Sequence, residues 1–348
     1  MKRILSLLLI LCLLVPACVL ATESATDSIR KSVIEANAPG DVSAVLESDG
    51  RIVGPVYGVN AETGVRGESL YVDAPLPADF TEEQRVLITA SFLEIDKDLL
   101  TDALLATGVK HSNIFLDHNC AYNTDLGITL PAPDTLLTHE QASTIAQRFV
   151  ADCGLGETRV LFALRPEEEA SRIAAQEAPE AQEAIVQRTL REWYRADTRY
   201  TSVRLLFTLR GLPVGETWMD ADNVCNSSVA NLFVGDAGEI RDFSLWYAPS
   251  EVSAAPYAGE LKTWQEALAE FSASYSPYNG EPRTDARGRE TPPLRDTVTQ
   301  ILPAYGSRDG KTFVPCWLFV TDTLALGDGD PVPSGYIWAT AIDARVGY

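Results

Sequence analysis

The sequence has few of the residues that usually carry metal binding or catalysis. Its 348 residues include three His and six Cys, and 28 Lys and Arg stand against 49 Asp and Glu. The formal net charge is therefore −21, and no stripe of Lys and Arg is available to bind a phosphate backbone. We expect no nucleic-acid partner and no electrostatic adhesion to anionic lipid.

The sequence motifs of common enzyme classes are missing as well. There is no G-x-S-x-G elbow, H-E-x-x-H motif, Walker loop or dinucleotide fingerprint, and no C-x-x-C pair that would indicate zinc. Asp117-His118-Asn119-Cys120 is the most reactive-looking tetrad, because a nearby imidazole can lower the pKa of a thiol. No oxyanion loop or orienting partner accompanies it. We therefore expect no catalytic site, cofactor or metal.

The first residues predict an export signal. Lys2 and Arg3 precede an apolar run over 4–15 that is too short for a membrane span. The run ends in Val15-Pro16-Ala17-Cys18, which resembles a bacterial lipobox, although Pro16 departs from the usual small residue. We predict a signal peptide over 1–21 and a lipid anchor on Cys18, with cleavage after Ala21 as the alternative. The mature protein, of charge −23 without Lys2 and Arg3, would be extracytoplasmic and lipid-anchored to the cell membrane, or otherwise secreted.

Four cysteines remain after the signal is removed. In an exported chain they permit two disulfides, with three possible connectivities. Widely spaced cysteines in a chain of this length can equally be buried thiols packed as small apolar residues. Both interpretations stay open for Cys120, Cys153, Cys225 and Cys316.

A repeated start signal organises the chain. Thr81, Thr138 and Thr263 each begin a T-x-x-[E/Q] capping box, followed by apolar residues at helical spacing. We predict short helices after each box, the first over 85–93. Strand-like runs follow the second and third boxes at 159–164, 203–209, 213–218, 229–234, 240–246, 297–302, 313–321 and 336–342. The predicted fold class is α+β, built from repeated units of a short helix packed on an antiparallel β-meander.

These signals divide the chain into three predicted units after the signal peptide. They are an N-terminal α+β unit over 22–136, a second over 137–250 and a C-terminal one over 251–348. A charged insertion at 166–194 predicts two exposed helical stretches broken at Pro179, which we interpret as a solvated face or as a partner-docking arm.

The two later units resemble a known type of domain. A helix begun by Thr138-His-Glu-Gln-Ala, strands that end in an Asp-Ala turn at Asp236, and the segments 312–319 and 337–343 are similar to the PepSY type of extracytoplasmic bacterial domain. Paired units behind an export signal also resemble the YycH/YycI regulators of a cell-wall histidine kinase. The resemblance covers 137–348 and implies binding of a partner protein without catalysis.

The sequence thus predicts a non-catalytic binding or regulatory lipoprotein of the cell envelope. Its expected partner is a kinase, protease or transporter, engaged through a sheet edge or the charged insertion. Trp264, on the first turn of a predicted helix, is expected to be exposed and is a candidate contact residue. The alternatives are a surface protein that binds sugar, peptide or cation, and a cell-wall hydrolase.

Overall fold

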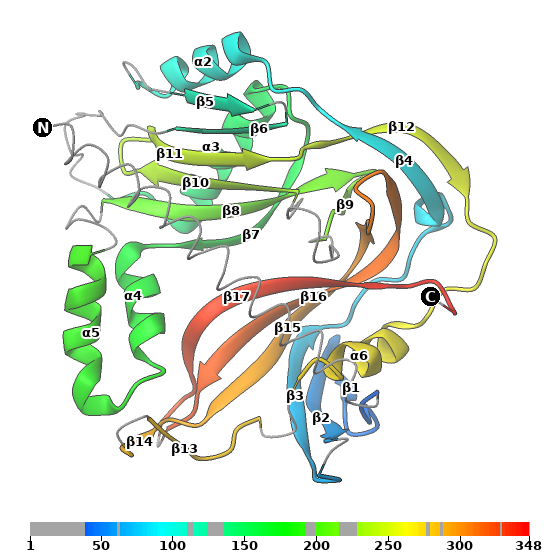
Figure 1. The fold of residues 1–348 in the computed structure, drawn as a ribbon, viewed down its shortest axis with the longest axis vertical. Helices are drawn as coiled ribbons and strands as arrows, with labels where there is room; N and C mark the ends of the chain where they lie inside the picture. Colours follow the sequence, from blue (N-terminus) through cyan, green and yellow to red (C-terminus); the bar gives the residue numbers. More distant parts are fainter. Residues whose placement is uncertain are drawn as a thin grey trace, which may run out of the picture.

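The computed structural model describes most of the chain after residue 38. The described residues are 39–60, 63–109, 114–117, 119–123, 136–192, 199–215, 228–275, 279–285, 288–327 and 329–347. They form a mixed α/β structure dominated by antiparallel sheets (Figure 1). The predicted signal peptide and Cys18 lie outside these residues.

Seven strands form one sheet, called the small sheet here. Its order is β5-β6-β11-β10-β8-β7, with β9 paired to β8, and every pairing is antiparallel. The β8–β9 connection is a tight turn at Arg210-Gly211, where both residues have positive φ, as a type I′ hairpin requires. The strands are β5 (Ile114–Asp117), β6 (Cys120–Asn123), β7 (Thr158–Leu164), β8 (Tyr200–Leu209), β9 (Leu212–Pro213), β10 (Val229–Gly235) and β11 (Ile240–Trp246).

Eight strands form the large sheet. Its order is β1-β2-β3-β15-β16-β4-β12, and β17 also pairs with β16. The β3–β15 pairing is parallel and joins Tyr71 to Thr297, while the other pairings are antiparallel. The strands are β1 (Leu46–Ser48), β2 (Arg51–Val59), β3 (Arg66–Pro75), β4 (Val86–Phe92), β12 (Pro249–Pro256), β15 (Leu294–Gly306), β16 (Thr312–Ala325) and β17 (Val332–Asp343); β13 (Arg283–Thr284) and β14 (Glu290–Thr291) form a separate short pair.

Two of the three capping boxes begin α-helices, as predicted. Thr138 and Thr263 each accept a hydrogen bond from the amide three residues on, and Gln141 and Glu266 reach back to the Thr amides. The α-helices of the described residues are α2 (Lys97–Ala106), α3 (His139–Asp152), α4 (Pro166–Ala174), α5 (Pro179–Glu192) and α6 (Trp264–Ser272). No helix among them is long and apolar enough to span a membrane.

The first box does not begin an α-helix, so that prediction is wrong. A single 3-10 turn, η1 (Glu82–Gln84), follows Thr81, and the chain then extends as β4. Val86, Ile88 and Ala90 are buried and alternate with more exposed residues, which is the period of a strand with one covered face. Antiparallel pairing with β12 and β16 stabilises this segment as a strand and not as a helix.

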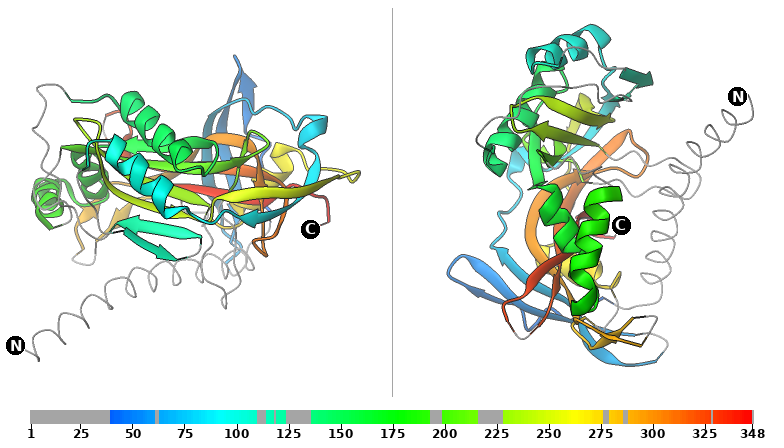
Figure 2. Two further views of the ribbon diagram at one scale, coloured as in Figure 1. Left: turned by 90° about the horizontal axis from the view of Figure 1, so that it is seen from above. Right: turned by 90° about the vertical axis from the view of Figure 1, so that its left-hand side faces the viewer.

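The packing clusters define the order of layers. One core lies between α2, α3 and the small sheet, and another lies between α6 and the large sheet. A third core joins the remaining faces of the two sheets. Strand β16 shows the alternation: Trp317 and Phe319 pack towards α6, whereas Leu318 and Val320 pack towards the small sheet. Figure 2 shows the two sheets from above and from the side.

The predicted repeat of helix and meander is not confirmed. The described residues of the segment expected as an N-terminal unit, 22–136, form no sheet of their own. Its strands β1 to β4 join β15 and β16 in the large sheet, and β5 and β6 join β11 in the small sheet. The β-strands therefore pair across the predicted unit boundaries, because the edges of β3 and β6 find partners far along the chain.

The charged insertion forms two helices broken at Pro179, as predicted, but α4 is not a solvated helix. Its Arg172 side chain is 8% exposed, pairs with Asp322 of β16, and donates from Nε to the Gly335 carbonyl at 3.0 Å. Helix α4 thus packs against the large sheet, and α5 lies beside it on the outside (Figure 2). Burial of Ala170 and Ala174 on one face of α4 accounts for the difference, since small side chains permit close approach.

Candidate functional site

The cysteines of the described part are buried free thiols. Cys120, Cys153 and Cys316 form no disulfide, and burial raises the pKa of Cys153 and of Cys316 to about 12. Cys225 lies outside the described residues, so its pairing stays open. For the other three, packing as small apolar residues is the interpretation that the structure supports.

Cys120 is not an activated thiol. Burial and the neighbouring Asp117 carboxylate both raise its pKa, whereas a nucleophilic cysteine needs a lowered one. His118 and His111 lie outside the described residues. The tetrad that looked most reactive in the sequence is therefore placed where its thiol is stabilised in the neutral form.

Trp264 is buried, so its predicted exposure is wrong. It is 7% exposed and packs in the core between α6 and the large sheet. The first turn of α6 faces the sheet because Leu268 and Phe271 extend the same stripe. The spacing of the apolar residues predicted the helix correctly. The capping box alone did not indicate which face of the helix packs against the sheet.

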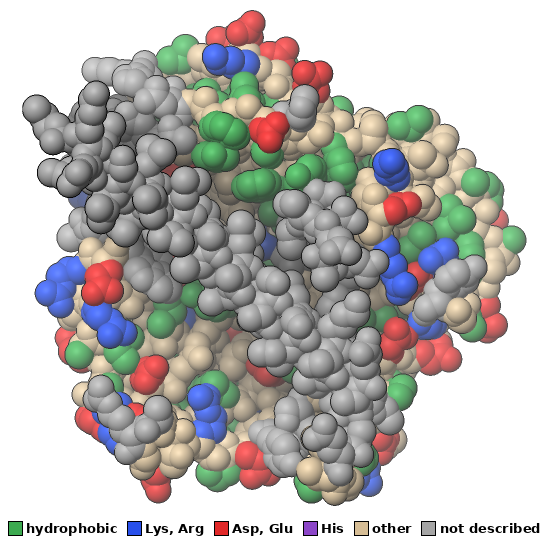
Figure 3. Space-filling view, viewed as in Figure 1, with side chains coloured by type: hydrophobic (Ala, Val, Ile, Leu, Met, Phe, Trp, Pro, Cys, Tyr) green, Lys and Arg blue, Asp and Glu red, His purple; other side chains and the backbone are tan. Residues whose placement is uncertain are grey.

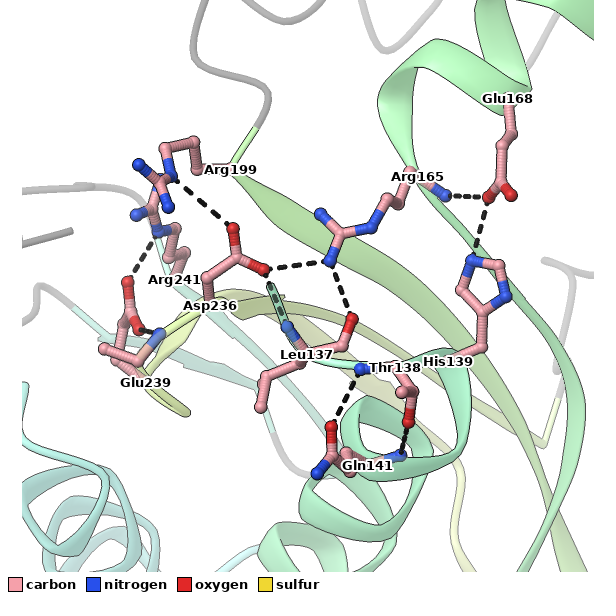
Figure 4. Close-up of polar contacts among 11 residues, drawn as sticks. Leu137, Thr138, His139, Gln141, Arg165, Glu168, Arg199, Asp236, Glu239 and Arg241 are labelled. Carbon is pink, nitrogen blue, oxygen red and sulfur yellow. Dashed lines mark hydrogen bonds and ion pairs between the residues drawn. The ribbon is translucent and has the colours of Figure 1, made fainter. Parts of the chain in front are cut away.

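A buried polar cluster lies at the β10–β11 turn, where the sequence indicates an Asp-Ala turn (Figure 4). The Asp236 side chain is 1% exposed, and its Oδ1 accepts from Arg165 Nη2 at 3.0 Å and from the Leu137 amide at 3.3 Å. Arg199 Nε lies 3.5 Å from the other carboxylate oxygen. A buried carboxylate held between two guanidinium groups keeps its charge compensated.

A second carboxylate completes this turn. Glu239, also 1% exposed, accepts from Arg241 Nε at 2.7 Å and from the Ala237 amide at 3.1 Å. Figure 4 shows the two acidic side chains directed to different arginines. Neither carboxylate is left as a general base without a cationic partner.

The same cluster fixes the beginnings of two helices. Arg165 Nη2 donates to the Leu137 carbonyl at 2.7 Å, just before α3, and Glu168 accepts from the Arg165 amide at 2.7 Å at the start of α4. His139 Nε2 lies 2.9 Å from Glu168 and is about half exposed, which agrees with its expected place on a first helical turn. The cluster is a structural clamp between a β-turn and two helices.

A cleft lies between the two sheets of the described structure. It has a volume of about 400 Å³ and lies where the two sheets part. Its walls are mostly apolar, and the polar side chains at it are few. It is lined by the segment 75–79, Thr81 and Gln84 on one side, by Arg159 of β7 and Leu212 of β9 on another, and by Gln300, Ile301, Leu302 and Pro303 of β15.

The electrostatics of the cleft depend on one arginine. Burial by the cleft walls lowers the pKa of Arg159, although the side chain remains open to water. No described residue forms an ion pair with Arg159, and Asp79, which also lines the cleft, does not reach it. The cleft thus presents an uncompensated cation beside apolar walls.

An aromatic row lies on the small sheet, and its Trp246 packs against the core that joins the two sheets. Phe115 stacks on Tyr122 with ring centroids 4.8 Å apart, and Tyr122 on Trp246 at 6.5 Å. On the same sheet, burial raises the pKa of Asp242 to about 6. Figure 3 shows several hydrophobic side chains on the upper part of this face, with acidic and basic side chains beside them.

The cleft could not be predicted from the sequence. The segment Pro75-Leu76-Pro77 is its nearest local signal, since prolines beside an exposed Leu indicate a rigid, partly apolar surface loop. Arg159 carries no such signal, because its position in the cleft results from the pairing of strands far apart in the chain. Within the described residues, no three His, Cys, Asp or Glu are placed to hold a metal ion.

Comparisons with known proteins add little. No protein-family model matches the chain, and no curated protein sequence matches it. Among solved structures, that of an uncharacterized protein from Eubacterium rectale ATCC 33656 aligns with 92% of this chain and 97% of that chain, at 12% identity and a TM-score of 0.42. Similarity at this level supports no conclusion about function.

Proposed function

We propose that this chain is a non-catalytic binding or regulatory lipoprotein that engages a partner protein of the cell envelope, such as a kinase, protease or transporter. The observation that supports a binding role is the cleft between the sheets, with apolar walls and an uncompensated Arg159. Binding sites are typically concave and mostly apolar, with a few polar groups that orient the bound molecule.

The Asp236–Glu239 cluster and the Cys120 thiol support a binding role, because none of them is arranged as a catalytic group. The buried carboxylates Asp236 and Glu239 are each held by arginine, and the Cys120 thiol has a raised pKa. A hydrolase would need a carboxylate or thiol placed to exchange protons with a substrate. Peptidoglycan zymography tests the cell-wall hydrolase alternative, and a cleared band lost in a Cys120→Ala variant would replace our proposal.

The location is a separate part of the proposal. The basic residues Lys2 and Arg3, the apolar run and Cys18 support export and lipid anchoring. Intact-mass measurement of the membrane fraction is expected to show a lipid-modified chain that begins at Cys18. A Cys18→Ala variant is expected to move to the soluble fraction, and a wild-type chain that begins at Thr22 would contradict the anchor.

Cross-linking in the native cell tests the partner. A tagged protein is cross-linked, purified under denaturing conditions and analysed by mass spectrometry, with the expectation that one envelope protein is reproducibly enriched. Leu76→Glu places a charge at the cleft, where Leu76 is 44% exposed, and is expected to remove that enrichment. Val332→Glu, at a site 53% exposed on β17, is the matched control and is expected to keep it.

A peptide ligand is the second candidate among the binding functions. The cleft volume of about 400 Å³ lies in the range of sites for small ligands. Cross-links confined to copies of this chain, together with a raised melting temperature in the presence of peptide, would favour that candidate over a protein partner.

A further inference from the structure

The position of Arg159 directs it into the cleft between the sheets. It lies on β7, the last strand of the small sheet, and is paired with Leu206 of β8, which belongs to the core that joins the sheets. Directly paired residues of adjacent strands share a face of the sheet. Arg159 therefore projects towards β15, on the side where Gln300 and Leu302 line the cleft.

Arg159 forms no ion pair with a described residue, as is also true of Arg85, Arg188 and Arg308, but of these four it is Arg159 that lines the cleft. Arg165 pairs with Asp236, Arg172 with Asp322, and Arg210 with Glu251 through two hydrogen bonds of 2.7 Å. The chain has 49 acidic residues, yet none of those described neutralises this cation. A partly desolvated guanidinium next to apolar walls gains from an anion supplied by another molecule.

We propose that the cleft binds the C-terminal carboxylate of an apolar peptide segment, with Arg159 as its counter-ion. The inference rests on the proposed function and specifies the part of the partner that is recognised. A guanidinium matches a carboxylate through two parallel hydrogen bonds. The walls formed by Pro75, Pro77 and Ile301 suit aliphatic or proline side chains.

Two carboxamides favour a peptide over a fatty acid. Gln84 Oε1 accepts from the Thr81 amide at 2.9 Å, which leaves the amino group of Gln84 as a donor at the cleft. Gln300 also lines the cleft, and its side chain forms no hydrogen bond with a described residue. A carboxamide both donates and accepts, as a peptide backbone does, whereas an alkyl chain offers neither group.

Asp79 sets the orientation of the ligand. Because it lines the cleft without pairing with Arg159, it disfavours a carboxylate on its own side. The C-terminus therefore lies towards β7, and the preceding residues lie along the segment 75–79. Asp79→Asn removes the like charge and is expected to leave binding equal or stronger.

Direct binding assays test the inference on the full mature chain. The probe is a pool of N-acetylated tetrapeptides of Ala, Val, Leu and Pro with free carboxylates, and the control is the same pool amidated at the C-terminus. Isothermal titration is expected to show binding of the free-acid pool alone. Arg159→Gln is expected to weaken it by about tenfold or more, as loss of a charged hydrogen bond does. Arg148→Gln, at a side chain 82% exposed, is the matched control and is expected to bind like the wild type.

The outcomes separate this inference from the proposed function. Equal binding of the amidated pool, binding of dodecanoate but not of peptides, or no binding of either pool would overturn it. Circular dichroism of Arg159→Gln confirms that a loss of binding is not a loss of fold. If the peptides fail but cross-linking still enriches an envelope protein, this inference falls and the proposed function stands. If the peptides bind but no envelope protein is enriched, the regulatory proposal falls and the peptide-binding candidate replaces it.

Discussion

Asp242 makes the stability of the fold depend on pH in a predictable direction. It lies on β11 opposite Phe233, on the sheet face away from the core that contains Phe243. Burial raises the pKa of its carboxyl from 3.8 to about 6, and a hydrogen bond from the Phe243 amide opposes that shift. No cation pairs with Asp242 among the described residues, so ionisation in the folded state is unfavourable.

The sign and size of the effect follow from this shift. Below about pH 3 the carboxyl is protonated in both states and contributes no difference. As the pH rises from 3.8 to about 6, the unfolded chain releases its proton before the folded one does, so the free energy of unfolding falls. Above about pH 6 the penalty is constant. A shift of about two units corresponds to roughly 3 kcal/mol, and we expect about 1–3 kcal/mol because the side chain is only partly removed from water.

Asp242→Asn removes this penalty while keeping the shape of the side chain. Urea denaturation of wild type and variant between about pH 3 and 8 is expected to give equal stability at the acid end. Near pH 7.5 the variant is expected to be more stable by about 1–3 kcal/mol. Asp330→Asn, in an exposed loop, changes the net charge equally and controls for general repulsion in this acidic chain. A variant no more stable than Asp330→Asn near neutral pH would refute the reasoning.

Three further predictions concern packing. Trp264→Ala is expected to lower the free energy of unfolding by about 3–5 kcal/mol in urea denaturation, because a buried indole is removed; a loss below about 1 kcal/mol would show that the site is not core. Arg172→Gln is expected to release α4 from β16, seen as faster hydrogen–deuterium exchange over 166–174 with α6 unchanged, and unaltered exchange in α4 would contradict the role of this ion pair. Cys153 and Cys316, both with a pKa of about 12, are expected to resist iodoacetamide at about pH 8 until urea is added, and alkylation of the folded protein would disprove their burial.

Local signals in the sequence predicted local structure well. The boxes at Thr138 and Thr263 begin helices because a hydroxyl and a carboxamide or carboxylate satisfy amides within one turn. The turn at Arg210-Gly211 and the break at Pro179 likewise depend on neighbouring residues alone. The box at Thr81 shows the limit of such signals, because the strand pairing of β4 overrides a start signal that is correctly formed.

Features that depend on pairing between segments far apart in the chain could not be predicted from the sequence. Nothing near Tyr71 indicates that it pairs with Thr297, so the predicted unit boundaries could not anticipate the two sheets. The cleft combines segments 75–84, 159, 212 and 300–303, and its arginine stands out only once these are brought together. The burial of Trp264 depends in the same way on strands that are remote from α6.

The parallel pairing of β3 with β15 has a consequence for how the protein folds. The partners are separated by more than half of the chain, so the contact order is high and folding is expected to be slow. During synthesis, β1 to β3 are made long before α6 and β15. Helix α6 covers these strands, and β15 extends the sheet beside β3. Until the last third of the chain is present, the apolar face that contains Ile52, Leu70 and Val72 has no cover. We therefore expect a chain truncated before α6 to bind holdase chaperones more strongly than the folded protein does.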